Sequence, residues 1–427
     1  MTKRNVWMLC AGLGLGIGCG QVEEEAPVPF GDPALHSQEE TMASLAARYQ
    51  WECYPERYGF TPPREVVRFP AEHEPQGELL MSWNQPGCGH PEQLALIFAA
   101  LEGRVPIHIV AAAPLHSGII QCLSQAGMTR AQIWELGLVP FRVDTEWIRD
   151  HGPDAVVGAD GKRRFVDTVL RPMQAVQCSS FDFYERSDRI PTVLGEWWGV
   201  PVDRPAVVLS GGNLLTDGAG RCFRARRETN ARNCFPVWCY SEEETDEAIG
   251  RAHGCDVVTL ESLEGGVVDH IDMWMAMLSS KTVLVGRYDV HDDAINAAIL
   301  DRNARRLADL GYDVVRIPMP TPYCQDAGDS CLGDPGRVRE CDGTNTRVWA
   351  TYLNSIRLGD VMAVPVYRWV PGSLAYRHQR QEQEALATYQ WALDREFGPG
   401  AVKVHPIPSD TVIPCQGALH RLTKTLR

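Results

Sequence analysis

The sequence predicts one α/β domain built from repeated units. From about residue 66 onward, an apolar strand pair, a helix and a further strand recur about five times, and no long linker interrupts them. The first and last units are each incomplete, and two such ends can complete one another if the chain closes into a ring. We therefore expect a single domain over residues 66–427, although 427 residues would allow two or three.

The first unit shows the pattern most clearly. Leu79–Trp83 is an apolar run that predicts a buried strand. A strand over 105–109 follows from alternating apolar residues. Between the two, a helix is predicted by apolar residues spaced i, i+3, i+4, i+7, namely Leu94, Ile97, Phe98 and Leu101.

The later units follow the same order. Asp160-Gly161 is typical of a hairpin turn, and Ser241 followed by three glutamates predicts a helix start. The second and third units are expected to contain strands 147–157 and 164–169, a helix through 194–198, strands 206–215 and 222–226, a helix from 241 and strand 257–260. The remaining expected elements are strands 267–278 and 282–285, helix 292–310, strands 314–317, 348–358 and 361–366, a helix around 386–393, a strand at 402–404 and a last strand from 418.

Composition excludes some classes of protein. The chain is 44% hydrophobic and 22% charged, as globular proteins are. Its formal net charge of −14 argues against a nucleic-acid partner, whose phosphates need a basic surface. A cationic ligand is compatible with this charge, and no metal or cofactor pattern is visible.

The N-terminus is typical of an exported protein. Residues 1–18 combine Lys3 and Arg4 with a short apolar stretch, which predicts a signal peptide. Cys19 then fits a lipid-acylation site, with plain cleavage or an incidental apolar start as the alternatives. Residues 19–65 begin with an acidic, proline-bearing stretch and are expected to form a solvated tether and extension. The prediction is an exported protein, either anchored to a membrane through Cys19 or released.

Cysteine usage supports export. Of fourteen cysteines, Cys10 and Cys19 belong to the signal region, leaving an even number of twelve. Two clusters lack the C-x₂-C spacing of zinc sites, so disulfides are the better interpretation, with connectivity left open. Residues 320–345 are expected to form a long loop pinned by a disulfide. The clusters are Cys222, Cys234 and Cys239, and Cys324, Cys331 and Cys341.

The stretch from Trp147 to Pro153 places a carboxylate inside an apolar context. A buried acid is costly unless a cation compensates it, and Arg149 is the nearest candidate for an ion pair with Asp150 at the end of a strand. Taken alone, a purely structural pair explains these residues as well as a functional one does.

Three further segments carry polar residues in apolar surroundings. His270 and Asp272 are expected on one face of a strand, as an acid/base beside an anion or as a structural pair. Gly212 and Asn213 belong to a glycine pair that permits close backbone approach, although a plain turn explains it too. Asn354 alone predicts either a site amide or a satisfied turn amide.

Together, and in this order, these segments are much more specific. The full set is Pro70–Gln76, Trp147–Pro153, Gly211–Asn213 before Asp217-Gly218, His270–Asp272, and Tyr352–Asn354 ahead of Val364–Tyr367. From about residue 66 to the C-terminus, the chain resembles the agmatine deiminase and Porphyromonas-type peptidylarginine deiminase family. The resemblance implies the pentein fold, a five-fold α/β propeller, which agrees with the repeat.

The resemblance also implies roles for these residues. Asp150 and Asp272 match carboxylates that clamp a substrate guanidinium through charge-assisted hydrogen bonds. His270 matches the general acid/base, and Asn354 a polar neighbour of the nucleophile. Trp147 would line the substrate channel through cation–π attraction, with Gly212 and Asn213 beside it. In the family a cysteine thiolate attacks the guanidinium carbon, and water then hydrolyses the covalent intermediate.

The chain departs from the family at the nucleophile. The family pattern Gly-x-Ile-His-Cys-Ile-Thr is replaced by Gly417-Ala418-Leu419-His420-Arg421-Leu422-Thr423, so Arg421 stands at the cysteine position. Arginine stays protonated and cannot attack, and its guanidinium could reach Asp150 and Asp272 as an internal substrate mimic. Cys415 would be roughly 20 Å away along a strand, so we expect no thiol chemistry from it.

Two functions remain open. One is an exported hydrolase that converts peptidyl or free arginine to citrulline and ammonia, with agmatine disfavoured by export, and in which the thiol is replaced or the activity impaired. The other is a non-catalytic relative that binds guanidino or arginyl ligands or only keeps the fold, and the residues favour this one. Arg171 could hold a peptide carboxylate or be an ordinary solvated arginine.

Overall fold

The structure is a computed structural model that describes residues 61, 64–75, 77–170, 185–227, 240–266, 269–326, 338–343 and 345–426. The expected signal peptide, Cys19 and most of the tether lie outside these residues. Among the helices that the structure describes, none combines the length and apolar character needed to cross a membrane.

The first sheet joins the two ends of the domain. Strand β2 (Glu78–Trp83) pairs in parallel with β3 (Ile107–Ala111), and helix α3 (Pro91–Glu102) connects them. Strand β20 (Lys424–Leu426), at the end of the chain, pairs antiparallel with the other edge of β2. The prediction that the incomplete start and end complete one another is therefore confirmed. Strand β4 (Gly137–Pro140) extends the sheet beyond β3, after helices α4 (His116–Gln125) and α5 (Arg130–Trp134).

Four more sheets repeat the connectivity of an antiparallel strand pair, a helix and a parallel strand. The second unit contains β5 (Asp154–Gly158), β6 (Arg163–Val166), α7 (Glu185–Asp188), α8 (Ile190–Trp198) and β7 (Val202–Asp203), with β1 (Val66–Arg68) on its edge. The third contains β8 (Leu215–Thr216), β9 (Arg221–Ala225), α10 (Glu242–His253) and β10 (Asp256–Leu260). The fourth contains β11 (Met275–Met277), β12 (Thr282–Arg287), α11 (Ala294–Asp309) and β13 (Asp313–Pro318). The fifth contains β17 (Ile356–Leu358), β18 (Val361–Val366), α12 (Ala375–Phe397) and β19 (Lys403–Pro408).

Local sequence explains why these helices begin where they do. In α10, the Ser241 hydroxyl accepts a hydrogen bond from the backbone N–H of Glu244, and the Glu244 carboxylate accepts one from the N–H of Ser241. This reciprocal cap, with acids in the first turn, stabilises the helix start. The helix then ends at Gly254, whose φ of 67° suits glycine.

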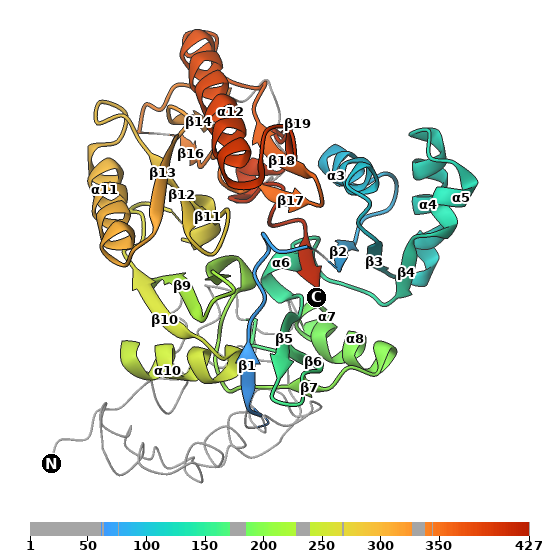
Figure 1. Ribbon diagram of the computed structural model, residues 1–427. Helices are drawn as coiled ribbons and strands as arrows, with labels where there is room; N and C mark the ends of the chain where they lie inside the picture. Colours follow the sequence, from blue (N-terminus) through green and yellow to red (C-terminus); the bar gives the residue numbers. More distant parts are fainter. Residues whose placement is uncertain are drawn as a thin grey trace, which may run out of the picture.

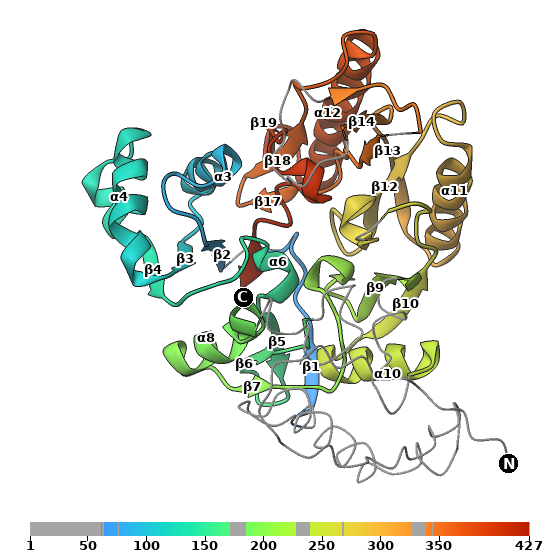
Figure 2. The same cartoon turned by 180° about the vertical axis from the view of Figure 1, so that it is seen from behind.

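The units lie around a central region, with the long helices on the outside (Figures 1 and 2). The C-terminal strand β20 lies near the middle of this arrangement, beside the short helix α6 (Ile148–His151). Residues that approach the centre therefore come from the strand ends and connecting turns of several units.

The predicted disulfides are present. Cys88–Cys122, Cys222–Cys255 and Cys324–Cys341 are bonded, and Cys415 is also part of a disulfide. The disulfide expected to pin the long loop over 320–345 is present as Cys324–Cys341, but the described parts of this segment also contain strands. Strand β14 (Tyr323–Gln325) pairs with β15 (Val338–Arg339) and β16 (Thr346–Val348), because Cys324–Cys341 holds the two sides of this segment together.

Several segments predicted as strands form turns instead, including parts of 206–215 and 348–358. Residues 148–151 form α6, and His270–Asp272 leads into the 3₁₀ turn η4 (Ile271–Met273), so β11 begins only at Met275. Residues 418–423 precede β20 and are likewise not extended. Asp269 has a φ of 52°, and that left-handed backbone interrupts the strand before His270. Alternation along a strand therefore does not explain how the polar residues meet.

Candidate active site

Arg421 places its guanidinium against Asp150. Its Nε donates to Asp150 Oδ2 at 2.9 Å, and its Nη2 lies 2.8 Å from the same oxygen. Its Cζ lies 4.6 Å from the centroid of the Trp147 ring, within cation–π range. The remaining nitrogen is bound by the backbone. Nη1 donates to the carbonyls of Cys415 at 2.5 Å and Gln416 at 3.3 Å. The predicted contact with Asp150 is therefore present.

The chain around Arg421 is shaped to hold this side chain. The 3₁₀ turn η6 (Ile413–Cys415) and the left-handed Gln416, with a φ of 59°, fold residues 413–417 back over the guanidinium. A Cβ on Gly417 would lie 2.1 Å from Arg421 Cδ, so only glycine leaves room for the side chain here.

Asn354 fixes the same segment from the other side. Its Oδ1 accepts hydrogen bonds from the backbone N–H groups of Ala418 at 2.7 Å and Arg421 at 3.3 Å. Its own carbonyl accepts one from the N–H of His420 at 3.1 Å. Asn354 is fully buried and lies in the turn before β17, not inside a strand as expected. Its contacts agree with the alternative of a satisfied turn amide.

Asp150, His270 and Asp272 approach a common point above Gly212. A Cβ on Gly212 would lie 2.5 Å from His270 Nδ1 and 3.2 Å from both Asp150 Oδ1 and Asp272 Oδ2. His270 Nδ1 and Asp150 Oδ1 are 3.7 Å apart. The structure thus brings together the three side chains that the sequence selected, and Gly212 leaves the space in which they meet.

The next residue, Asn213, supports this arrangement through the backbone. It is fully buried in the 3₁₀ turn η3 (Gly211–Asn213). Its amide bonds to the N–H and carbonyl of Ala225 at 3.0 Å and accepts from the N–H of Ile271 at 3.1 Å. Asn213 therefore links η3 to β9 and η4 by hydrogen bonds, and these bonds fix the position of His270 and Asp272 relative to Gly212.

Asp272 has a different partner from the one expected. Its Oδ2 lies 2.7 Å from His420 Nδ1, whose Nε2 in turn lies 2.7 Å from Glu72 Oε2. Arg149 completes this network, with Nη1 2.5 Å from Glu72 Oε1. No contact between Arg421 and Asp272 occurs among the described residues, so the prediction that one guanidinium reaches both acids is wrong. Asp272 is already engaged by a histidine.

These contacts also correct the interpretation of Arg149. The sequence suggested that it compensates Asp150, its neighbour in the chain, but the two side chains of a single helical turn diverge. Arg149 is directed to Glu72, and the cation beside Asp150 comes from Arg421, 271 positions away. Glu72 and His420 were not predicted as members of this network, because the two residues lie 348 positions apart in the chain.

The electrostatics follow from these pairs. Burial opposes ionisation of Asp150, but Arg421 and His270 nevertheless hold its pKa below the ordinary value. Glu72 is also buried, and Arg149 and His420 hold its pKa well below the ordinary range. Burial and Arg149 oppose protonation of His420, yet Glu72 and Asp272 raise its pKa. The centre of the molecule therefore contains ionised acids paired with cations.

Cys415 lies close to Arg421 but has no free thiol. The chain does not run as a strand between the two residues, so the expected separation of roughly 20 Å is wrong. The carbonyl of Cys415 touches the Arg421 guanidinium, and its sulfur is committed to a disulfide. Arg171 lies outside the described residues.

The chain matches the family model described as Porphyromonas-type peptidyl-arginine deiminase over residues 68–426. It is 23% identical over 332 residues to the agmatine deiminase of Ectopseudomonas mendocina, covering 72% of this chain and 85% of that protein. The agmatine deiminase of Pseudomonas putida is 24% identical over 326 residues, with the same two shares.

Solved structures show the same fold. The agmatine deiminase of Enterococcus faecalis superposes with a TM-score of 0.65 at 18% identity, covering 87% of this chain and 98% of that one. It is one of several deiminases of the pentein fold, an α/β fold, that this chain resembles in structure. Because the family model spans most of the domain, the chain belongs to the agmatine and Porphyromonas-type peptidyl-arginine deiminase family, whose members are guanidino-group hydrolases.

Proposed function

We propose that this chain is a catalytically silent member of its family, in which Arg421 acts as a built-in guanidinium ligand. The observation that carries this proposal is the position of the Arg421 guanidinium, bound to Asp150 and stacked on Trp147. The family resemblance assigns Asp150 to the clamp around the substrate guanidinium and Trp147 to the lining of the substrate channel. The site is retained, and its ligand is part of the chain.

A missing nucleophile supports the same proposal. Arginine is protonated at any physiological pH and has no lone pair with which to attack a guanidinium carbon. The seven cysteines in the described part of the chain are all disulfide-bonded, so none of them offers a thiolate. His270 would remain a competent acid/base, but without a nucleophile it has no intermediate to resolve.

Occupation by Arg421 should also weaken binding of outside ligands. A tethered group competes at an effective concentration of roughly millimolar or more, without the entropic cost of association. An arginyl or agmatine ligand would have to displace Arg421 and the two carbonyl contacts that it makes. We therefore favour a protein whose guanidinium site is filled by its own side chain over one that binds free guanidino compounds.

The test compares the parent protein with Arg421→Cys and with Arg421→Ser as the matched control. Citrulline and carbamoyl products are measured with arginine, an arginyl peptide and agmatine. We expect no turnover from the parent, slow turnover from Arg421→Cys, and ligand binding without turnover from Arg421→Ser. Turnover by the parent would overturn the proposal and favour the alternative, an exported deiminase of peptidyl or free arginine that works without this cysteine.

The same experiment has a second informative outcome. If Arg421→Ser does not bind guanidino ligands more tightly than the parent, Arg421 is not a built-in ligand and the site has diverged more widely. Isothermal titration with agmatine measures this directly. Agmatine concentrations up to about ten millimolar are needed, because the effective concentration of the tethered Arg421 guanidinium lies in that range.

We further propose that the protein is exported and held at a membrane through a lipid on Cys19. The three described disulfides and the disulfide-bonded Cys415 support an oxidising compartment. Fractionation of bacteria that express the full chain or Cys19→Ala tests this. We expect the full chain with the membranes and the variant in the soluble exported fraction, whereas cytosolic retention of both would contradict it.

We also propose that the five units form the five-fold propeller of the pentein fold. Their shared connectivity and the pairing of β20 with β2 support this description. Removal of residues 424–427 should then destabilise the first unit, because β20 is the strand that pairs antiparallel with β2.

A further inference from the structure

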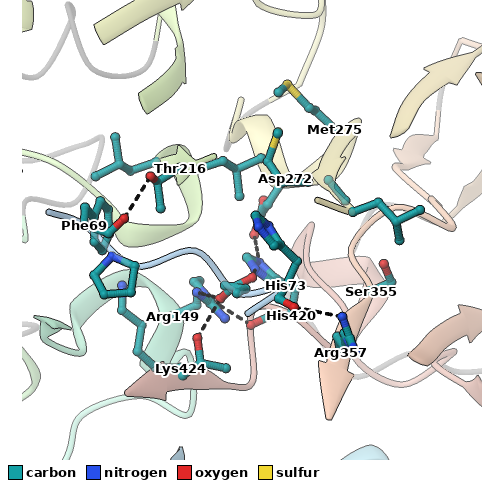
Figure 3. Close-up of a pocket in the computed structure, with 18 of the residues that line it drawn as sticks. Phe69, His73, Arg149, Thr216, Asp272, Met275, Ser355, Arg357, His420 and Lys424 are labelled. Carbon is teal, nitrogen blue, oxygen red and sulfur yellow. Dashed lines mark hydrogen bonds and ion pairs between the residues drawn. The ribbon is translucent and has the colours of Figure 1, made fainter. Parts of the chain in front are cut away.

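A second cavity lies behind the network that engages Asp272. Its empty volume is about 860 Å³, a figure that includes space open to solvent. Arg149, Asp272, His420 and Lys424 line it together, as Figure 3 shows. None of the residues around the Arg421 guanidinium contributes to it, and of the three side chains that meet above Gly212 only Asp272 lines it. We refer to it as the rear cavity.

The separation follows from alternation along two segments. Arg149 lines the rear cavity, whereas Asp150 binds Arg421. In the same way, His420 lines the rear cavity and Arg421 fills the guanidinium site. In α6 and in the segment before β20, one residue therefore lines the rear cavity and the next residue contributes to the guanidinium site.

The rear cavity brings cations and acids together. Its charged lining contains the permanent cations Arg149, Arg357 and Lys424, together with His420, whose pKa Glu72 and Asp272 raise. The three lining acids are Glu72, Asp154 and Asp272. Protonation of His420 gives the cavity one more cation than acids, in a chain whose formal net charge is −14, and this suits a ligand with one negative charge.

One cation in the lining has unused hydrogen-bonding capacity. The Arg149 side chain is 4% exposed, with Nη1 beside Glu72 and Nε donating to the His420 carbonyl at 3.2 Å. Its Nη2 is buried and has no hydrogen-bond partner among the described residues. A buried donor without an acceptor is costly, and a carboxylate oxygen would satisfy it with a charge-assisted bond.

Much of the remaining wall is apolar, although His73, Thr216, Ser355 and Thr425 also line it. Strand β11 contributes Met275 to Met277, and Leu214, Leu353 and Met362 come from neighbouring units. A fully polar anion such as phosphate would leave this surface without a matching partner, whereas a hydrocarbon chain would be removed from water against it. Flexible methionine side chains also adapt to ligands of varied shape.

We propose that the rear cavity binds a monocarboxylate with an apolar tail, with Arg149 as the residue that holds the carboxylate. Its lining excludes Arg421 and Asp150 and shares Asp272 with the candidate active site. Binding in the rear cavity does not require that the protein be catalytically silent. Failure of one proposal therefore does not contradict the other.

The test uses the full chain and measures affinity by isothermal titration and thermal shift with hexanoate. Acetate carries the same head without the tail, and hexylamine carries the same tail with the opposite charge. We expect hexanoate to bind at least tenfold more tightly than acetate and hexylamine to give no saturable binding. Equal weak effects of hexanoate and acetate would mean non-specific ion binding and would overturn the proposal.

Two variants locate the site. Arg149→Met should weaken hexanoate binding at least tenfold, because it removes the charge and the unused donor while keeping the apolar bulk. Ala276→Phe fills the cavity without changing charge, so it should abolish binding even if Arg149→Met fails to fold. Ala131→Phe, on the exposed face of α5, is the matched control and should bind as the parent does.

A final arm separates this inference from the proposed function. In Arg421→Ser, agmatine should not compete with hexanoate, since the two ligands occupy different cavities. Competition would place hexanoate in the guanidinium site and refute the rear-cavity assignment. Hexanoate binding that survives Ala276→Phe would refute it as well, whatever the outcome of the citrulline assays.

Discussion

Asp150 and Asp272 approach the same point above Gly212, yet each is neutralised in a different way. Asp150 is paired with Arg421, the residue at the family's nucleophile position. Asp272 is paired with His420, which Glu72 also holds. The family resemblance suggested a single guanidinium clamped between two acids, and the structure instead divides the two acids between two side chains of one segment.

Under the proposed function, this difference explains how a single replacement fills a substrate site. Arg421 needs only one carboxylate, one aromatic face and two carbonyls to satisfy its nitrogens. The second acid is already engaged by His420 and needs no further change. On this proposal, the replacement at position 421 leaves the surrounding network intact, and one variant can reverse it.

The largest expected effect distinguishes the two acids directly. Asp150→Ala leaves the Arg421 cation without its carboxylate, and breaking a buried ion pair from one side typically costs about 3–5 kcal/mol. Asp272→Ala should cost less, about 1–3 kcal/mol, because His420 keeps its contact with Glu72. Urea unfolding of both variants measures the difference.

A double variant is the control for this comparison. Asp150→Ala with Arg421→Ser removes both charges, so it should be more stable than Asp150→Ala alone. Equal destabilisation by the two single acid variants would show that Arg421 is not specifically dependent on Asp150.

A smaller effect concerns the histidine next to Asp150. Burial lowers the pKa of His151 to about 4, and neither ring nitrogen has a hydrogen-bond partner among the described residues. The unfolded chain binds the proton near pH 6.5, before the folded protein does, so stability should fall as pH drops from about 6.5 to about 4. The loss approaches 3 kcal/mol by the same relation.

The variant His151→Phe should flatten this pH dependence, because it cannot be protonated. Urea midpoints at pH 4.5, 5.5 and 7 check the effect, and the exposed His405→Phe is the matched control.

His420 should act in the opposite direction. Its pKa is raised, so its contribution is present below pH 6.5 and is lost as pH rises through the folded value.

The smallest expected effect concerns the amide that holds the Arg421 segment. Asn354→Ala removes the acceptor for the N–H groups of Ala418 and Arg421, which should cost about 2 kcal/mol. In the Arg421→Cys background it should also slow any citrulline formation, because the residue at position 421 loses its anchor. Unchanged unfolding and turnover would show that Asn354 does not position this segment.

The sequence alone could determine much of the architecture, because periodicity is local information. Alternating and helical apolar spacing gave most units in the right order, and the incomplete ends correctly implied that the C-terminal strand completes the first sheet. The motif order selected Asp150, His270 and Asp272, and the residue at position 421 revealed the missing cysteine. Each of these inferences depends on residues near one another in the chain or on a pattern that the whole family shares.

Tertiary structure alone decided which charges meet. Nothing local distinguishes Arg149 from Arg421 as the partner of Asp150, and the choice depends on a turn that directs neighbouring side chains of α6 to opposite sides. The strands expected around His270, Asn354 and Arg421 became turns because side-chain amides and a left-handed Asp269 replaced ladder hydrogen bonds. Contacts such as His420 with Glu72 join positions 348 residues apart, and their energy exists only once the sheets have assembled.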